Sequence, residues 1–497
     1  MVKIKSFVKD IKGIKNIRES FQTRQVKYGG YAALMTLAVL VGLILVNLIA
    51  GQFSLQVDMT ENRIFSLSEQ SIHVLDGITT PVRIFGLWRP GERMPLPGGR
   101  DHIEDLTAVI NLYTSRNRNI TMEVIDPDRN PGFVVRYDRD RTGLLRGSII
   151  VEGENGFRVI PLTEMYDFAQ DRGGGLDVAG IAIERRITSA LLFVGTGVTP
   201  VVYEIVGHGS IPLAAIGMDG ELERDNLALD SINLLMAPIP ADASVLILTQ
   251  PQRDLAPIEA ERLLDFLGNG GRLLVMADFN IRELENLNMV FASFGFRFDY
   301  GILNEADPSF AVFDYRTTWP NVMLHDITRP LMNRNETPII LFEAMPVSTM
   351  EPRRQTVEIT PLLLSSPAAF LRTDLDNDSP DRIPSDIPGP HTLAMAVKDP
   401  SWVRDDEPQA RIVVIGSGAL LPLAAGGFMG NRDLFMNSLA WLQDRPEAIS
   451  IRSRSLFRLP LRLDNLQFLI FGGLFIFVIP MAFFATGFVT WLKRRHL

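Results

Sequence analysis

Four almost continuously apolar stretches, separated by helical patterns, constrain the fold more than any other feature of this sequence. They are VVYEIV (201–206), SVLILT (244–249), RLLVMA (272–277) and RIVVIGSG (411–418). Strands that are apolar on both faces are typical of a parallel sheet with helices packed on each side. The clearest helical pattern, through Ile258, Leu263 and Leu267, ends at the sequence GNGG. Residues 200–450 therefore predict a doubly wound parallel-sheet α/β domain with an irregular insert at about 300–395.

A smaller α/β pattern precedes this domain, in residues 58–195. Ser66 and Glu69 have the spacing of a capping box at a helix start. Three further segments predict strands and a hairpin, with a helical pattern between the first two: VRIFGLW (82–88), ITMEVI (120–125) and GSIIVEGENGFRVI (147–160). A βαβ unit followed by a hairpin predicts a small thioredoxin-like domain, without redox cysteines because the chain has no cysteine.

Two uncharged segments, 28–51 and 466–492, flank these domains. Each is longer than the roughly 20 apolar residues that cross a bilayer, so we expect an N-terminal and a C-terminal transmembrane helix. Residues 1–27 combine helical apolar spacing with lysines and predict a basic amphipathic cytoplasmic helix, with a generic topogenic charge cluster as the alternative. Basic residues at both ends predict that both termini are cytoplasmic. The expectation is a membrane-anchored α/β protein of the cytoplasmic (inner) membrane with its bulk in the periplasm.

The charge distribution excludes several classes of function. The chain has 49 basic and 58 acidic residues, and residues 1–27 and 493–497 hold eleven of the basic but only two of the acidic ones. The acidic part between them makes nucleic acid an unsuitable partner. Without cysteine there is no disulfide, thiolate metal site or cysteine nucleophile. No Gly-Lys dipeptide occurs, so the chain lacks a Walker A lysine and any ATPase must be another chain.

The stretch that follows the first strand of the large domain is the main candidate site. It consists of Gly207, His208, Gly209 and Ser210. A turn at the carboxyl end of a parallel strand is where open α/β sheets bind ligands, and glycines let backbone amides approach a ligand closely. These four residues are therefore a candidate ligand-binding turn. A purely structural turn with a hydrogen-bonded histidine is the favoured interpretation.

A third interpretation makes the same turn a hydrolase centre. His208 would deprotonate Ser210, and Glu204 or Asp230 would orient the imidazole. The Gly-x-Ser-x-Gly sequence of a nucleophile elbow is absent, however, and residues two apart on one turn rarely point at each other. We therefore expect no catalytic residue.

Cofactor and metal patterns are incomplete. GTG (195–197) and GSG (416–418) lack the third glycine of a dinucleotide fingerprint. DLDNDS places three aspartates at the first ligand positions of a calcium loop, but Ser379 replaces the turn glycine and Ser385 the final glutamate. The aspartates are Asp374, Asp376 and Asp378. We expect neither a metal nor a cofactor.

Several stretches of the chain resemble the GldG-like auxiliary components of gliding-motility-type ABC transporters. Among them are DMTENRIFSLSEQS (58–71), YEIVGHGS (203–210) and NRDLFMNSLAWLQDR (431–445). The resemblance implies a non-catalytic extracytoplasmic subunit that binds a ligand or couples partners to a separate ABC permease and ATP-binding subunit. It also implies that the second domain is glutamine amidotransferase-like but lacks that enzyme's cysteine nucleophile. Membrane lipid and further copies of the chain are other expected partners. A membrane-anchored serine/histidine hydrolase and a structural surface scaffold are the alternatives.

Overall fold

The computed structural model describes most of the chain, in two compact units, Met1–Ile64 and Phe65–Leu497. The described residues are 31, 34–43, 66–138, 144–170, 176–277, 284–332, 338–400, 409–425, 429–445, 454–455 and 472–495. In the first unit, residues 34–43 form a helix on which apolar side chains such as Leu34 and Met35 are exposed. The basic segment 1–27 lies outside the described residues.

The prediction of two transmembrane helices, at 28–51 and 466–492, is wrong for the part of the chain that the structure describes. No helix there is both long and apolar enough to cross a membrane. The helix α13 (Ile479–Arg495) has 17 residues. At 1.5 Å per residue it is about 26 Å long, short of the roughly 30 Å of a hydrocarbon core, and its last three residues are basic. A π-helical turn, η6 (Leu474–Val478), precedes it.

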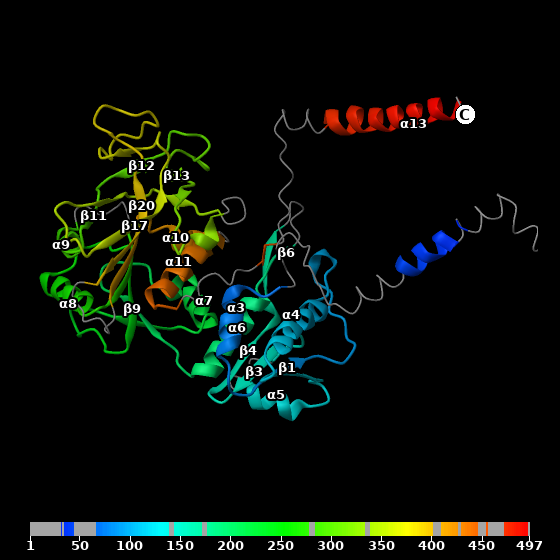
Figure 1. Ribbon diagram of the computed structural model, residues 1–497. Helices are drawn as coiled ribbons and strands as arrows, with labels where there is room; N and C mark the ends of the chain where they lie inside the picture. The colour runs from blue at the N-terminus through cyan, green and yellow to red at the C-terminus, as the bar shows by residue number, and fades with distance from the viewer. Residues whose placement is uncertain are drawn as a thin grey trace, which may run out of the picture. The chain divides into compact units, whose positions relative to one another are not determined.

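The small α/β part contains a four-stranded sheet in the order β2-β1-β3-β4. Figure 1 labels β1, β3 and β4 of this sheet. Its strands are β1 (Val82–Leu87), β2 (Ile120–Ile125), β3 (Ile149–Gly153) and β4 (Gly156–Ile160). β1 and β2 are parallel and α4 (His102–Arg116) connects them, whereas β3 and β4 form an antiparallel hairpin. This is the βαβ unit and hairpin that the sequence predicts, and it makes β4 an edge strand.

Three helices complete the small part: α3 (Glu69–Gly77), α5 (Pro131–Tyr137) and α6 (Ile183–Thr196). The N-cap of α3 is Ser68, whose hydroxyl accepts the Ser71 N–H, so the helix begins two residues later than the Ser66 spacing predicts. α6 packs against β3 and β4 and ends at Gly197, where φ is +68°. A second hairpin, β5 (Tyr166–Gln170) and β6 (Leu176–Ile181), pairs with β22 (Arg454–Ser455).

The large part is built on an eight-stranded sheet in the order β14-β17-β20-β21-β10-β9-β7-β8. Five strands are parallel: β7 (Val201–Ile205), β8 (Ala228–Ile232), β9 (Ala243–Thr249), β10 (Arg272–Met276) and β21 (Ala410–Ile415). Taken in chain order, these five are arranged 2-1-3-4-5, which is a doubly wound order.

Helices cover both faces of this sheet, as the strand pattern predicts. α8 (Pro257–Gly268) and α9 (Glu285–Ala292) contribute to one apolar core, together with strand residues such as Leu246 and Leu248. α7 (Met218–Arg224), α10 (Leu420–Ala425) and α11 (Met429–Leu442) contribute to the other, together with Val245 and Ile247 (Figure 1). Neighbouring residues of β9 thus enter opposite cores, which explains why the strand is apolar throughout.

The segment expected as an irregular insert also extends the large sheet. β17 (Glu358–Leu364), β20 (Thr392–Asp399) and β14 (Asn321–Val322) pair antiparallel beside β21. The rest forms short paired strands: β11 (Phe296–Phe298), β12 (Ile302–Asn304), β13 (Thr317–Thr318), β15 (Leu341–Phe342), β16 (Val347–Thr349), β18 (Phe370–Arg372) and β19 (Ile387–Pro388). The sequence pattern did not predict β14, β17 and β20 as strands of the large sheet, because they lie among prolines and loops.

Candidate functional site

The turn Gly207–Ser210 lies at the switch point of the parallel strands. β8 pairs with one edge of β7 and β9 with the other. The connection from β7 to β8 therefore runs one way along the sheet, and the connection from β8 to β9 runs back past β7. In doubly wound sheets the crevice at such a point is the usual ligand position. The Gln252 N–H, in the loop after β9, donates to the His208 carbonyl at 2.7 Å, so the loops after β7 and β9 are in contact.

Both glycines of the turn have backbone angles that favour glycine. φ is +107° at Gly207 and +82° at Gly209. A Cβ atom on Gly209 would lie 2.9 Å from the Cβ atom of Gln252, and one on Gly207 would lie 3.0 Å from Nδ2 of Asn233. The two glycines therefore allow both a left-handed backbone conformation and a close approach of neighbouring side chains.

His208 is buried and is oriented by an acid that the sequence did not indicate. Its Nε2 atom is 3.1 Å from Oε2 of Glu259, in the first turn of α8, and the same oxygen accepts the Ala256 N–H at 2.8 Å. Nδ1 of His208, Oε1 of Glu259 and the hydroxyl of Ser210 are buried without hydrogen-bond partners among the described residues. A neutral His208 that donates from Nε2 to the carboxylate keeps an acceptor lone pair on Nδ1.

The proposed orienting acids lie elsewhere. Glu204 is buried at the end of β7, where both its carboxylate oxygens accept the Leu213 N–H at 3.1 Å. Burial raises the pKa of Glu204, against the opposing effect of the Leu213 N–H and the Thr249 hydroxyl. Asp230 is exposed on β8. No hydrogen bond joins Ser210 to His208 within the described chain, so the four residues of the turn do not assemble a catalytic triad.

A second group of polar residues, absent from the sequence predictions, lies where α6 of the small part meets α7 and α11 of the large part. Arg185 and Arg186 both pair with Asp225, which directly follows α7; the Nη1 atom of Arg186 is 3.0 Å from it. Arg432 of α11 lies 3.9 Å from Glu221. Burial alone would raise the pKa of Asp225, but the two arginines of α6 hold it below its ordinary value. A single substitution here would leave a buried charge without its partner.

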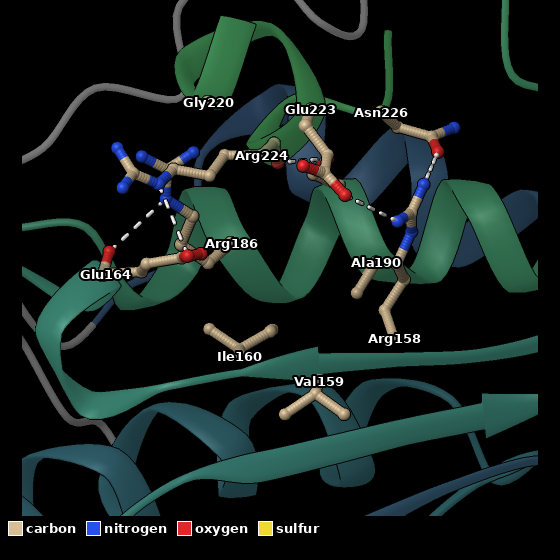
Figure 2. Close-up of a pocket in the computed structure, with 11 residues that line it drawn as sticks. Arg158, Val159, Ile160, Glu164, Arg186, Ala190, Gly220, Glu223, Arg224 and Asn226 are labelled. Atoms are coloured by element: carbon tan, nitrogen blue, oxygen red, sulfur yellow. Dashed lines mark hydrogen bonds and ion pairs between the residues drawn. The ribbon is translucent and has the colours of Figure 1, made fainter. Parts of the chain in front are cut away.

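A cavity of about 260 Å³ opens beside this cluster (Figure 2). Arginines from three elements line it: Arg158 of β4, Arg186 of α6 and Arg224 of α7. Arg224 Nε is 3.3 Å from Glu164, and Arg158 donates to Oδ1 of Asn226 at 2.9 Å. Most of the lining residues are charged or polar. In the sequence, the Arg-Arg pair at 185–186 was the only sign of this cavity, and an apolar helix pattern obscures it.

The acidic loop DLDNDS is organised around an arginine. Arg372 donates to the backbone carbonyls of Asn377, Ser379 and Asp381 and forms a buried ion pair with Asp386 at 2.7 Å. Asp374 and Asp376 are exposed, and Asp378 pairs with Arg316. Among the described residues no group of acids or histidines could hold a metal ion.

Solved structures that resemble the chain do so distantly. The mmIFT52 N-terminal domain aligns with a TM-score of 0.36 and 13% identity, over 49% of this chain and 97% of that chain. A putative ThuA-like protein from Bacteroides uniformis ATCC 8492 aligns with a TM-score of 0.29 and 14% identity, over 49% and 89%. The exo-beta-1,4-mannosidase Op5Man5 from Opitutaceae bacterium strain TAV5 aligns with a TM-score of 0.26 and 9% identity, over 68% and 48%. None of these similarities carries an argument about function.

The sequence of the large part matches a family model. No curated protein matches the chain. The family described as "ABC-type uncharacterized transport system" matches residues 200–438, from the start of β7 into α11, a span that includes the turn Gly207–Ser210 and Glu259. Residues 200–438, in the large α/β part of this chain, are therefore similar to the family described as ABC-type uncharacterized transport system.

Proposed function

We propose that the chain is a non-catalytic auxiliary subunit that couples a ligand to the permease and ATP-binding subunit of an ABC transporter. The observation that carries the proposal is the family match over residues 200–438. The chain has no Walker A lysine to hydrolyse ATP itself, so energy must come from another subunit.

The ligand contact in this proposal is the turn of Gly207, His208, Gly209 and Ser210. It lies at the switch point within the matched span, and His208 and Ser210 keep unused hydrogen-bonding atoms. The GldG-like subtype, contact with membrane lipid and association of several copies belong to the same proposal. A location of residues 58–464 outside the cytoplasm is supported by the acidic composition between the basic ends.

Affinity purification of the full chain from membranes in mild detergent, followed by mass spectrometry, tests the coupling. A permease and an ATP-binding subunit should be enriched relative to an unrelated tagged membrane protein. If neither is enriched, the transporter role is refuted. Light scattering of the purified complex reports the number of copies, and lipid analysis reports bound lipid.

Two further experiments test the remaining parts. Protease added to spheroplasts should digest residues 58–464, and full protection would refute the extracytoplasmic location. A fluorophosphonate serine probe should label wild type and Ser210→Ala equally weakly. If wild type is labelled and Ser210→Ala is not, the turn is a hydrolase centre and the proposed binding role is refuted.

A further inference from the structure

A second, larger cavity adjoins the one in Figure 2, and the two share Arg158, Val159 and Glu223. Its volume is about 730 Å³, within the range of small-molecule sites. Its lining includes residues of the edge strand β4, of the end of α5 and of the last turn of α6. Apolar side chains make up much of its lining: Tyr137, Leu144, Leu145, Phe157, Val159, Pro161 and Phe193.

The aromatic rings of this lining hold one another in place. Tyr137 and Phe157 meet edge to face, with ring centroids 4.9 Å apart. Phe193 lies under the guanidinium of Arg158, whose Cζ atom is 4.3 Å from the ring centroid. Such rings present flat apolar faces to a ligand. Leu145 is 67% exposed at the cavity, a large apolar surface for a residue in contact with water.

Of the three arginines that line the smaller cavity, Arg158 has its positive charge farthest from a carboxylate. Arg186 and Arg224 have carboxylates at 3.0 and 2.7 Å, whereas the nearest carboxylate to Arg158, that of Glu223, is 4.0 Å away and its side chain is 76% exposed. Figure 2 shows Glu223 and Asn226 on either side of the Arg158 guanidinium.

The amide of Asn226 fixes the position of that guanidinium. Asn226 is buried, donates to the Val198 carbonyl at 3.2 Å and accepts from Arg158 at 2.9 Å, so the orientation of its amide is determined. Arg158 has five N–H groups, and its hydrogen bond to Asn226 uses one of them. A carboxylate could therefore bind it in a two-pronged geometry.

The same cavity contains a buried polar atom without a partner. Ser148 lines it, is fully buried, and its Oγ atom has no hydrogen-bond partner among the described residues. Two acids, Asp138 and Glu223, also line the cavity, so a bound anion must be held by Arg158 against them.

We infer that this cavity is a binding site for a small molecule with a flat apolar body and one carboxylate group. The body lies against Tyr137, Phe157 and Phe193, and the carboxylate pairs with Arg158 in competition with Glu223. The inference is independent of the transporter role, because it rests on the lining of this cavity and on the contacts of Arg158 with Asn226 and Glu223, and not on the family match.

Isothermal titration calorimetry of the full chain with 2-naphthoate and 2-naphthamide, at constant ionic strength, tests it. The two probes share one body and differ in charge. Naphthoate should bind at least tenfold more tightly than naphthamide. Arg158→Gln should weaken naphthoate binding at least tenfold and leave naphthamide unchanged, whereas Glu223→Gln should strengthen naphthoate binding severalfold by removing the competing carboxylate.

Arg83→Gln is the matched control, because Arg83 also lies over a phenylalanine ring, that of Phe85, and pairs with a glutamate, Glu152. It should change neither affinity. Equal affinity for both probes, no binding of either probe, or an equal loss in Arg83→Gln would each overturn the inference. Glu223 is exposed, so Glu223→Gln remains informative if Arg158→Gln does not fold.

Discussion

The Nε2 atom of His208 lies 3.1 Å from Oε2 of Glu259, a residue 51 positions later in the chain. The contact joins the turn after β7 to the first turn of α8, the helix that follows β9. Because Glu259 also accepts the Ala256 N–H, one buried carboxylate orients the imidazole and satisfies a backbone donor at the start of that helix. The pair thus holds the two loops of the switch point together.

Replacement of His208 by alanine should destabilise the fold. It leaves the Glu259 carboxylate buried without the imidazole, and the expected loss is about 1–3 kcal/mol in the free energy of unfolding. Thermal and urea unfolding measure it. His73→Ala, at an exposed position of α3, is the control and should stay within about 0.5 kcal/mol of wild type. Equal effects of the two substitutions would show that the His208–Glu259 contact contributes nothing.

Gly209→Ala and Gly220→Ala should have opposite effects. At Gly209 alanine would adopt a left-handed conformation and its Cβ would lie 2.9 Å from the Gln252 side chain, so a loss of about 1–3 kcal/mol is expected. At Gly220, inside α7, no neighbouring atom lies within 4 Å and alanine should gain up to about 1 kcal/mol. Calorimetric melting of both variants checks the sign. A stabilised Gly209→Ala would contradict the described turn.

Glu204→Gln should change how stability depends on pH. Burial raises the pKa of Glu204 above its ordinary value, so its ionisation disfavours the folded state, and stability is lost as pH rises through the folded pKa. Relative to wild type, the glutamine variant should become more stable as pH rises from about 4, the unfolded value, through the folded pKa of Glu204. Urea unfolding at a series of pH values measures the difference, with exposed Glu223→Gln as the control. A pH-independent difference would refute the burial effect.

Asp225→Asn should show the reverse dependence. The pKa of Asp225 is lowered, so the ionised carboxylate contributes stability above the unfolded pKa of about 3.9 that is lost as pH falls through the folded value. At pH 7 the variant leaves Arg185 and Arg186 without their shared partner, and a loss of about 3–5 kcal/mol is expected. The deficit should shrink in acid. Asp230→Asn, exposed on β8, should have little effect at any pH.

Local apolar patterns predicted the strands and helices well, because burial on both faces of a parallel sheet leaves a continuous apolar signal in the chain. β7 and β10 lie within the stretches singled out in the sequence, and β9 and β21 each begin one residue before theirs. The partners within the candidate site were not predictable in this way. In the sequence, Glu259 has the pattern of an ordinary acidic residue in the first turn of a helix. Its contact with His208 forms only when α8 packs against the sheet.

The prediction of two membrane-spanning helices was wrong for a related reason. Composition alone does not determine where a regular helix begins and ends: α13 starts at Ile479, well inside the uncharged segment, and its 17 residues include three basic ones beyond it. The ionic cluster of Arg185, Asp225 and Arg432 was also hidden, because its members lie on three elements far apart in the sequence and each is compatible with an exposed helix end.

The position of β21 has a consequence for how the protein is made. This strand, residues 410–415, lies between β10 and β20, although both precede it in the chain. Until the ribosome has released β21, those two strands each keep an unpaired edge, which is a template for pairing with another chain. Completion of the large sheet is therefore a late event in synthesis, and a nascent chain that stalls before residue 410 exposes two apolar strand edges to aggregation.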